Sequence, residues 1–346
     1  MKRLFLPILF TTLLACVDGY KPADTGESAY PNLVVADALT SSIHGFDTTT
    51  GTYIGEMTSG SMSAPSAMRF GPVSLLVTET DIAGGTAAVY SVDTTDWSVS
   101  TFIDSTAYPG MTSANGIEMD PSGNILVAST DTHEVLRFAG PESDPTTTGY
   151  APGEFIDVFV SAGDGGLSNP TCIGFGLTGG PESSDFLICS QDGGIKRYNG
   201  STGAYVDDYI ADTVLTEPWD FALHPVGVTA KIYVTDKAGN LVKRFDPGDT
   251  SVVETWVPDD PPNNGQLTGP TGILHGIDGA LFVSSSSTGY VNQYGGLDTT
   301  DPGAFLDTID TTTALDAPMG MAVISPMVME EDEDEFPPDD TGAAPE

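Results

Sequence analysis

The chain has 346 residues, and its 11 Lys and Arg residues stand against 49 Asp and Glu residues, which gives a formal net charge of −38 at pH 7. Such a negative field repels phosphate backbones and anionic headgroups, so we exclude binding to nucleic acid and attachment to membranes through basic patches. Hydrophobic residues make up 39% of the chain, enough for a sizeable core, and 40 Gly and 25 Pro favour short strands and tight turns over helices.

The N-terminal segment, residues 1–16, has the pattern of a secretory signal peptide. Lys2 and Arg3 precede an apolar run that begins at Leu4 and is too short to span a bilayer as a stable helix. The sequence from Leu13 to Cys16 resembles a bacterial lipobox, which implies cleavage before Cys16 and acylation of this residue. We therefore expect an exported, lipid-anchored protein of the cell envelope. Ordinary secretion, with cleavage nearby and no lipid on Cys16, is the alternative.

Two segments without hydrophobic periodicity flank the rest of the chain. Residues 17–32 are rich in Asp, Gly, Pro and Ser, which is typical of a flexible tether. Residues 325–346 contain the acidic run Glu330–Glu335, which cannot bury a core and is expected to be disordered. This tail either keeps the protein soluble or loosely binds divalent cations or a partner.

Between these segments, residues 33–324 contain a repeat of roughly 50 residues. Each unit opens with a short strand that begins with Pro or Ala and has a small residue nearby, and in five units a second, a third and a fourth strand follow. The six opening segments are Pro65–Met68, Ala114–Ile117, Pro170–Ile173, Pro218–Phe221, Pro270–Ile273 and Pro318–Met321. Four antiparallel strands in a repeat of this length are the signature of a propeller blade.

The two ends of the repeat region complement each other. Residues 33–35, 43–46 and 53–56 read as a second, a third and a fourth strand without a first, whereas residues 318–324 read as a first strand alone. The C-terminal strand is therefore expected to join the N-terminal blade, which leaves no open sheet edge at the seam. The sequence predicts an all-β fold, a six-bladed β-propeller with four antiparallel strands per blade.

The second full unit carries the most specific family resemblance. Ala114–Ile117, Asp120–Gly123, Asp131, His133 and Val135–Phe138 together resemble the NHL-repeat pattern of secreted bacterial propellers. The resemblance implies the propeller fold. The superfamily of these propellers also includes gluconolactonase-type hydrolases and streptogramin-type lyases. Propellers carry unrelated activities, and the resemblance therefore does not fix the function.

Cys172 and Cys189 fall on the first and second strands of one unit. In the preceding unit the corresponding residues are Gly116 and Ala128, which a symmetric hairpin would place opposite each other, with Ile117 opposite Val127. Opposed positions on adjacent strands are within disulfide reach, and an exported protein meets an oxidising compartment. We predict a Cys172–Cys189 disulfide, the alternative being two reduced cysteines that pack as small apolar residues.

One unit breaks the pattern of the opening strand. Its third residue is Asp220 where the other units have Ala, Gly or Cys, and Trp219 before it is the only large aromatic residue at its position. The propeller fold gives no reason for such a deviation in one blade. We therefore infer a candidate site at the mouth of the propeller's central channel, formed by Asn115, Glu217, Trp219 and Asp220. They would hold Ca²⁺ or another divalent cation, or form a polar ligand site. Alternatively, Asp220 accepts hydrogen bonds from a neighbouring strand and Trp219 packs between blades.

No nucleophile, phosphate-binding or dinucleotide motif is present in the sequence. Our leading hypothesis is a monomeric binding or interaction module that recognises a protein or a small molecule on one propeller face. The alternative is a metal-dependent hydrolase of the gluconolactonase type, in which Glu, Asn and Asp hold the ion. A streptogramin-lyase-like enzyme using His224 or His275 is a third hypothesis.

Overall fold

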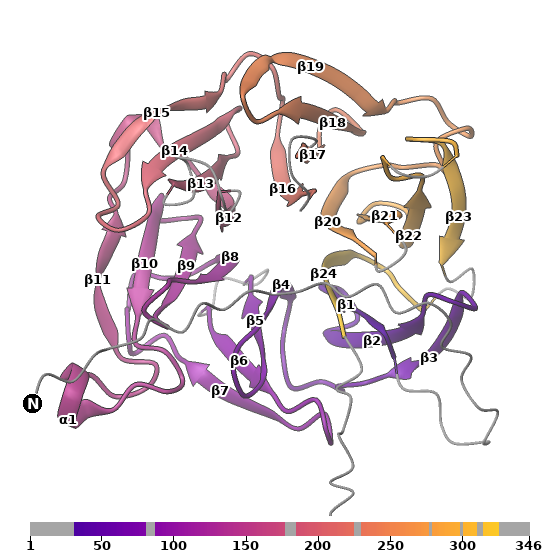
Figure 1. The fold of residues 1–346 in the computed structure, drawn as a ribbon. Coiled ribbons are helices and arrows are strands. Elements are labelled where there is room, and N and C mark those ends of the chain that lie inside the picture. The colour runs from indigo at the N-terminus through magenta and orange to yellow at the C-terminus, as the bar shows by residue number, and fades with distance from the viewer. Residues whose placement is uncertain are drawn as a thin grey trace, which may run out of the picture.

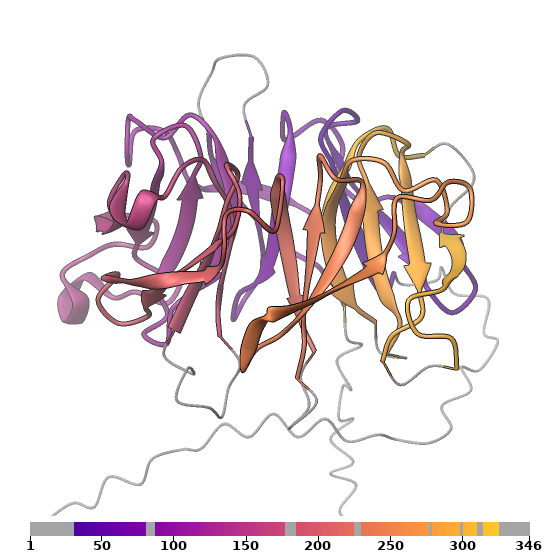
Figure 2. The ribbon, with the colours of Figure 1, turned by 90° about the horizontal axis from the view of Figure 1, so that it is seen from above.

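The computed structural model describes residues 31–80, 87–176, 185–224, 230–276, 279–297, 300–309 and 314–324. The strands in these ranges form six four-stranded antiparallel sheets, which are arranged as a ring in Figure 1. Seen from the side in Figure 2, the inner strands of the blades stand roughly upright along the ring axis, and outer strands are tilted away from it. The fold is the predicted six-bladed β-propeller.

The blades are numbered along the chain, and their strands are given from the ring axis outwards. Blade 1 contains β24 (Pro318–Val323), β1 (Leu33–Asp37), β2 (Ser42–Asp47) and β3 (Thr52–Glu56). Blade 2 contains β4 (Pro65–Phe70), β5 (Leu75–Glu79), β6 (Val89–Val92) and β7 (Val99–Ile103). Blade 3 contains β8 (Ala114–Met119), β9 (Ile125–Ser129), β10 (Glu134–Phe138) and β11 (Phe155–Val160).

The remaining blades follow the same order. Blade 4 contains β12 (Pro170–Phe175), β13 (Asp185–Ser190), β14 (Ile195–Asn199) and β15 (Tyr205–Ile210). Blade 5 contains β16 (Pro218–Leu223), β17 (Ile232–Asp236), β18 (Leu241–Asp246) and β19 (Asp249–Val257). Blade 6 contains β20 (Pro270–His275), β21 (Leu281–Ser285), β22 (Tyr290–Tyr294) and β23 (Phe305–Ile309). Two short helical turns, α1 (Pro145–Thr148) and η1 (Asp164–Gly166), lie in connections between strands.

The core lies between blades rather than inside each one. The second strands β1, β5, β9, β17 and β21 are buried along their whole length, because neighbouring blades cover both of their faces. A strand covered on both faces needs a continuous apolar run, and these strands are rich in Leu, Ile and Val. One cluster, for example, joins Leu126 of blade 3 to Ile173 and Phe186 of blade 4. Inter-blade packing therefore fixes the ring.

The C-terminal strand closes the ring as predicted. β24 pairs antiparallel with β1, with Leu33 opposite Val323, and Figure 1 shows the two strands side by side. Oδ2 of the buried Asp37 accepts the N–H groups of Asp316 and Ala317 at 2.7 and 2.9 Å. The seam is thus joined by strand pairing and by a buried carboxylate.

In the first hairpin of blade 3, the symmetric register that we predicted from the sequence is wrong in part. Ile117 does pair with Val127, but the register shifts between Ala114 and Ile117, so Gly116 does not face Ala128 in a regular pair. The shift occurs where the first strands converge on the axis: a Cβ atom on Gly116 would lie 2.9 Å from the Thr171 carbonyl oxygen of blade 4. Close packing of neighbouring strands therefore overrides hairpin symmetry.

Blade 4 contains a disulfide at this irregular position. Cys172 and Cys189 are bonded, and their Cα atoms lie 5.0 Å apart. In blade 2 the corresponding residues are Ala67 and Thr78, and the Thr78 hydroxyl accepts the Ala67 N–H at 2.9 Å. The disulfide thus occupies the place of a hydroxyl bridge between the first and second strands.

The predicted signal peptide (1–16) and acidic tail (325–346) lie outside the described residues, as does the tether apart from its last two residues. Of those two, Asn32 is tied to the propeller, because its carbonyl oxygen accepts the Ile324 N–H at 3.0 Å. In the described part of the chain, no helix has the length and apolar character needed to cross a membrane.

Candidate functional site: the axial channel

A channel with a volume of about 540 Å³ runs along the ring axis and is lined by β4, β8, β12, β16, β20 and β24. Figure 1 shows these six strands around the centre of the ring. Because the six strands are equivalent, their residues form successive rings along the channel. The second residues of the strands form one ring and the third residues the next, so each candidate residue can be compared with its five counterparts.

Most residues of the second-position ring form hydrogen bonds between blades. The ring consists of Ser66, Asn115, Thr171, Trp219, Thr271 and Met319. Thr171 and Thr271 donate their hydroxyls to the carbonyl oxygens of Pro218 and Pro318 in the following blades, at 2.9 and 2.8 Å. Both threonine residues are buried. At these two positions a small hydroxyl side chain joins one blade to the next.

Asn115 belongs to this ring and has the same structural role. Its Oδ1 accepts the hydroxyls of Ser66 and Thr80 at 3.0 and 2.9 Å, and its Nδ2 donates to Thr130 Oγ1 at 2.6 Å. Ser66 and Thr80 belong to blade 2, so the amide joins blade 2 to blade 3. Since Oδ1 already accepts two hydrogen bonds, Asn115 does not present a free oxygen to the channel.

Trp219 is the one aromatic member of this ring, and like Met319 it has no hydroxyl with which to join the next blade. The side chain is half-buried, and the Lys237 Nζ lies 3.5 Å from the centroid of its ring. Glu217 lies next to this pair, with its Oε1 accepting Gln191 Nε2 at 2.7 Å. Burial lowers the pKa of Lys237, an effect that Glu217 partly offsets. Tryptophan, a cation, a carboxylate and an amide are thus gathered at the channel end where the first strands begin.

Asp220 occupies the third-position ring and bridges two blades. Its Oδ1 accepts the Phe221 N–H at 2.8 Å, and its Oδ2 accepts the Ile273 N–H of blade 6 at 3.2 Å. The side chain lines the channel and is half-buried. Protein surrounds the channel on every side, and this desolvation raises the pKa of Asp220 to about 7, against the effect of the two N–H donors. Among the described residues, no ion pair involves Asp220.

An ion pair lies further along the channel. Arg69 NH2 lies 2.8 Å from Glu118 Oε1, and both are the fifth residues of neighbouring first strands. Burial raises the pKa of Glu118, while Arg69 and the Met119 N–H act in the opposite direction. The channel therefore contains one paired carboxylate and one without a cationic partner.

The structure brings together only some of the predicted site residues. Asn115, Trp219 and Asp220 line the channel, whereas Glu217 is not a lining residue and bonds to Gln191 instead. In the described ranges, no three His, Cys, Asp or Glu side chains are grouped so that they could hold a metal ion. The oxygen-rich cluster that the sequence suggested is not assembled, because the Asn115 amide joins blades and Glu217 lies outside the channel.

His224 and His275 lie at the opposite ends of their strands from Trp219, and neither lines the channel. Their rings are nearly perpendicular with centroids 5.2 Å apart, and His275 also packs on Tyr233. Burial lowers the pKa of His275 to about 4, and His224 adds to the effect. The pair is packed between blades 5 and 6.

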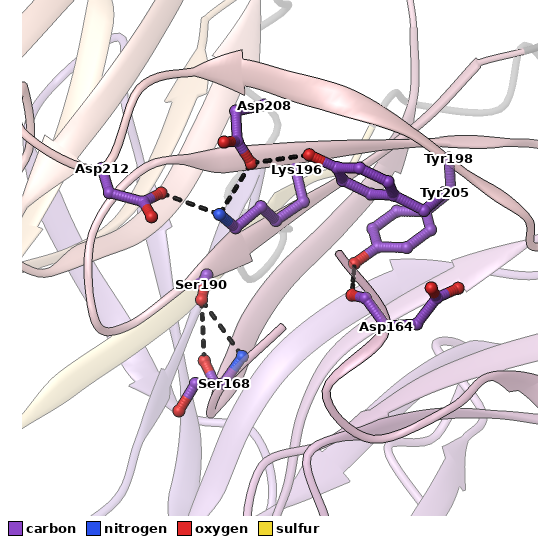
Figure 3. A network of polar contacts seen from close by, with 8 residues as sticks. All are labelled: Asp164, Ser168, Ser190, Lys196, Tyr198, Tyr205, Asp208 and Asp212. Carbon is purple, nitrogen blue, oxygen red and sulfur yellow. Dashed lines mark hydrogen bonds and ion pairs between the residues drawn. The ribbon is translucent and has the colours of Figure 1, made fainter. Parts of the chain in front are cut away.

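Blade 4 contains a separate polar network, shown in Figure 3, around the buried Lys196. Lys196 Nζ donates to Asp208 and Asp212 at 2.7 and 2.8 Å, and Tyr205 donates to Asp208. Burial opposes the charged form of Lys196, but these hydrogen bonds outweigh it, so its pKa is raised. With its ammonium group held by two carboxylates, the network fastens the outer strand β15 to β14.

Sequence reasoning missed Lys237, Arg69 and Glu118. The strand register contained the signal for Lys237, because Pro218 pairs with Asp236 and this places Lys237 beside the Glu217–Trp219 segment. Comparing the fifth residues of the opening strands would have indicated the ion pair, since Arg69 and Glu118 are charged and adjacent around the ring. Both signals require the register of the hairpins or of the ring.

No family model and no curated protein matches the sequence. Among solved structures, the chain is similar to one from a nidogen/laminin complex, with a TM-score of 0.62 and 14% identity over 84% of this chain and 96% of the other. It also matches virginiamycin B lyase from Staphylococcus aureus, with a TM-score of 0.49 and 14% identity over 74% and 73% of the two chains. The first likeness shows the propeller fold.

Proposed function

We propose that this protein is a binding module that recognises a partner protein with the face around Trp219. The main support is Trp219 itself, the one aromatic residue of the second-position ring, in which Met319 likewise lacks a hydroxyl. Two of its members, Thr171 and Thr271, join the blades through hydroxyls, whereas Trp219 gives up that bond and keeps an indole partly exposed beneath Lys237. Tryptophan is enriched among the residues that dominate protein interfaces.

The charge of the chain supports a basic partner. A net charge of −38 attracts a positively charged surface from a distance and speeds association at low salt. The structure from the nidogen/laminin complex places a propeller of this fold in one protein assembly, and at 14% identity that likeness concerns the fold alone. The proposal for this chain therefore rests on the Trp219 face and on charge.

Export and anchoring remain part of the proposal. The lipobox-like end at Cys16 is compatible with attachment to the cell envelope, where a rigid ring on a tether would meet partners. Labelling of cells with a radioactive fatty acid tests the anchor. We expect label in the wild-type chain and none in Cys16→Ser, and unlabelled wild-type protein released into the medium would instead indicate ordinary secretion.

The binding proposal is tested with the immobilised full-length protein and extracts of the cells that produce it. A captured protein is purified, and its affinity is measured for the wild type, Trp219→Thr and Leu306→Thr. Leu306 is a matched control because its side chain is 46% exposed on the outer strand β23. We expect Trp219→Thr to weaken binding at least about tenfold, with weaker binding at high salt for all three proteins. Equal affinity of the three proteins would refute the role of this face.

A further inference from the structure

Asp220 occupies a gap between blades that its three glycine counterparts do not have. In the third-position ring, Gly272 and Gly320 lie so close to the next strand that a Cβ would be 2.3 Å from the Met319 carbonyl oxygen or 2.4 Å from that of Ser66. Between β16 and β20, by contrast, the strands leave room for a whole carboxyl group. The two N–H groups that it accepts occupy only part of its capacity, since a carboxylate offers about four acceptor positions.

The channel charge is unbalanced at this point. Arg69 and Glu118 neutralise each other further along the axis, so an ionised Asp220 leaves the channel with one excess negative charge. The fourth and fifth residues of a strand lie about 3–7 Å along the axis from the third. The fourth-position ring is apolar and consists of Met68, Ile117, Ile173, Phe221, Ile273 and Met321. The isoleucines are buried between blades, whereas Met68 and Phe221 are half-buried and keep apolar surface towards the channel.

A carboxylate without a cationic partner beside an apolar ring indicates which kind of ligand the channel would bind. A hard divalent cation takes six or more oxygen ligands, whereas the third-position neighbours of Asp220 in the lining are Ala, Gly and Cys. An organic cation needs one carboxylate for its charge and an apolar wall for its body. A volume of about 540 Å³ accommodates such a molecule.

We propose that the axial channel binds an organic cation, an amine or alkylammonium with an apolar body, whose charged group contacts Asp220 and whose body packs against Met68 and Phe221 of the fourth-position ring. This site goes beyond the proposed partner-binding face, because it lies inside the ring and its occupant is a small molecule. The two can fail separately: loss of partner binding in Trp219→Thr does not depend on any channel ligand.

The test is a calorimetric titration of the full-length protein with cyclohexylammonium at about pH 8, where Asp220 is ionised. Cyclohexanol is the neutral probe of the same size. We expect one cyclohexylammonium per chain and at least about tenfold weaker binding of cyclohexanol. No saturable binding of the ammonium, or equal binding of the two probes, would overturn the proposal.

Three variants separate the channel from the acidic surface. We expect Asp220→Asn to weaken the ammonium at least about tenfold, and Asp259→Asn, at an exposed aspartate, to leave it unchanged. Ala67→Leu places bulk in the third-position ring without altering charge, and should also abolish binding if it folds as judged by its melting midpoint. An equal loss in Asp220→Asn and Asp259→Asn would assign binding to surface charge. Tighter, one-to-one displacement of the ammonium by Ca²⁺ would replace the proposal with a metal site.

Discussion

At the scale of single residues, Asp220 and Trp219 illustrate how a repeat exposes function. The other five blades have the same backbone arrangement. A side chain that differs from its equivalents in those blades can therefore be recognised by comparison. Trp219 lacks the inter-blade hydroxyl bond of Thr171 and Thr271, and Asp220 places a carboxyl group in a desolvated channel. Residues retained at a cost in stability are typical of binding sites.

The raised pKa of Asp220 makes a prediction about stability. Its pKa is about 7 in the folded protein against an ordinary value of 3.8, so the folded state holds the proton more tightly than the unfolded state does. The contribution of Asp220 to the free energy of unfolding is therefore greatest below about pH 4 and falls as the pH rises towards 7. Asn cannot ionise. Relative to wild type, Asp220→Asn should gain about 2–4 kcal/mol between pH 4 and pH 8.

Urea unfolding of both proteins at the two pH values measures this difference. The matched control is Asp259→Asn, whose exposed carboxylate should show no such gain. A stability difference between Asp220→Asn and wild type that is the same at both pH values would mean that the Asp220 carboxyl ionises normally in the folded protein.

At the scale of strands, the first hairpins of blades 2, 4, 5 and 6 are each fastened by one group between their two strands, whereas blades 1 and 3 have Ala36 and Ala128 at this place. Thr78, Thr235 and Ser284 take this place in blades 2, 5 and 6, and each also donates its hydroxyl to the following blade, at 2.6, 2.8 and 2.6 Å. In blade 4 the Cys172–Cys189 disulfide takes the same place. In the four blades that have this bridge, its chemistry varies between a hydroxyl and a disulfide, whereas its position is the same.

This equivalence predicts the outcome of replacing the disulfide. Removing it in Cys172→Ala/Cys189→Ala should lower the free energy of unfolding by about 2–4 kcal/mol. Cys172→Ala/Cys189→Thr copies the Ala67–Thr78 pair of blade 2 and should recover about 1 kcal/mol through the new hydroxyl bonds. Chemical denaturation of the three proteins tests this, and two double variants of equal stability would show that blade 4 does not accept the hydroxyl bridge.

The fold could be predicted from the sequence at this scale because the same strand pattern recurs in several units of the repeat. All six first strands begin at the residues expected for them, from Pro65 to Pro318. The site was less predictable: whether Glu217 faces the channel or Gln191, and whether the Asn115 oxygen is free, depends on side-chain contacts between blades. Such contacts join residues far apart in sequence, and a single chain gives no local pattern for them.

At the scale of the whole molecule, the ring is held together by its seam. The pairing of β24 with β1 and the bonds from Asp37 to Asp316 and Ala317 join the two ends of the described chain. Neighbouring blades bury each other's faces, so a ring that opens at one seam exposes apolar strands on both sides.

Truncation tests the importance of the seam. A chain that ends at residue 316 lacks β24 and should lose cooperative unfolding or melt at least about 10 °C below the full chain. A chain that ends at residue 324 keeps β24, removes only the predicted acidic tail and should melt within about 2 °C of the full chain. Similar midpoints for all three would show that β1 does not depend on its C-terminal partner.

The melting midpoint of Trp219→Thr, compared with that of the wild type, decides whether Trp219 serves binding or the fold. Thr at this position reproduces Thr171 and Thr271, and its hydroxyl should donate to the Pro270 carbonyl oxygen of blade 6 as theirs do to Pro218 and Pro318. If Trp219 serves binding rather than the fold, the variant should melt at or above the wild-type temperature. A midpoint more than about 5 °C lower would show that Trp219 is a packing residue and would contradict its assignment to binding.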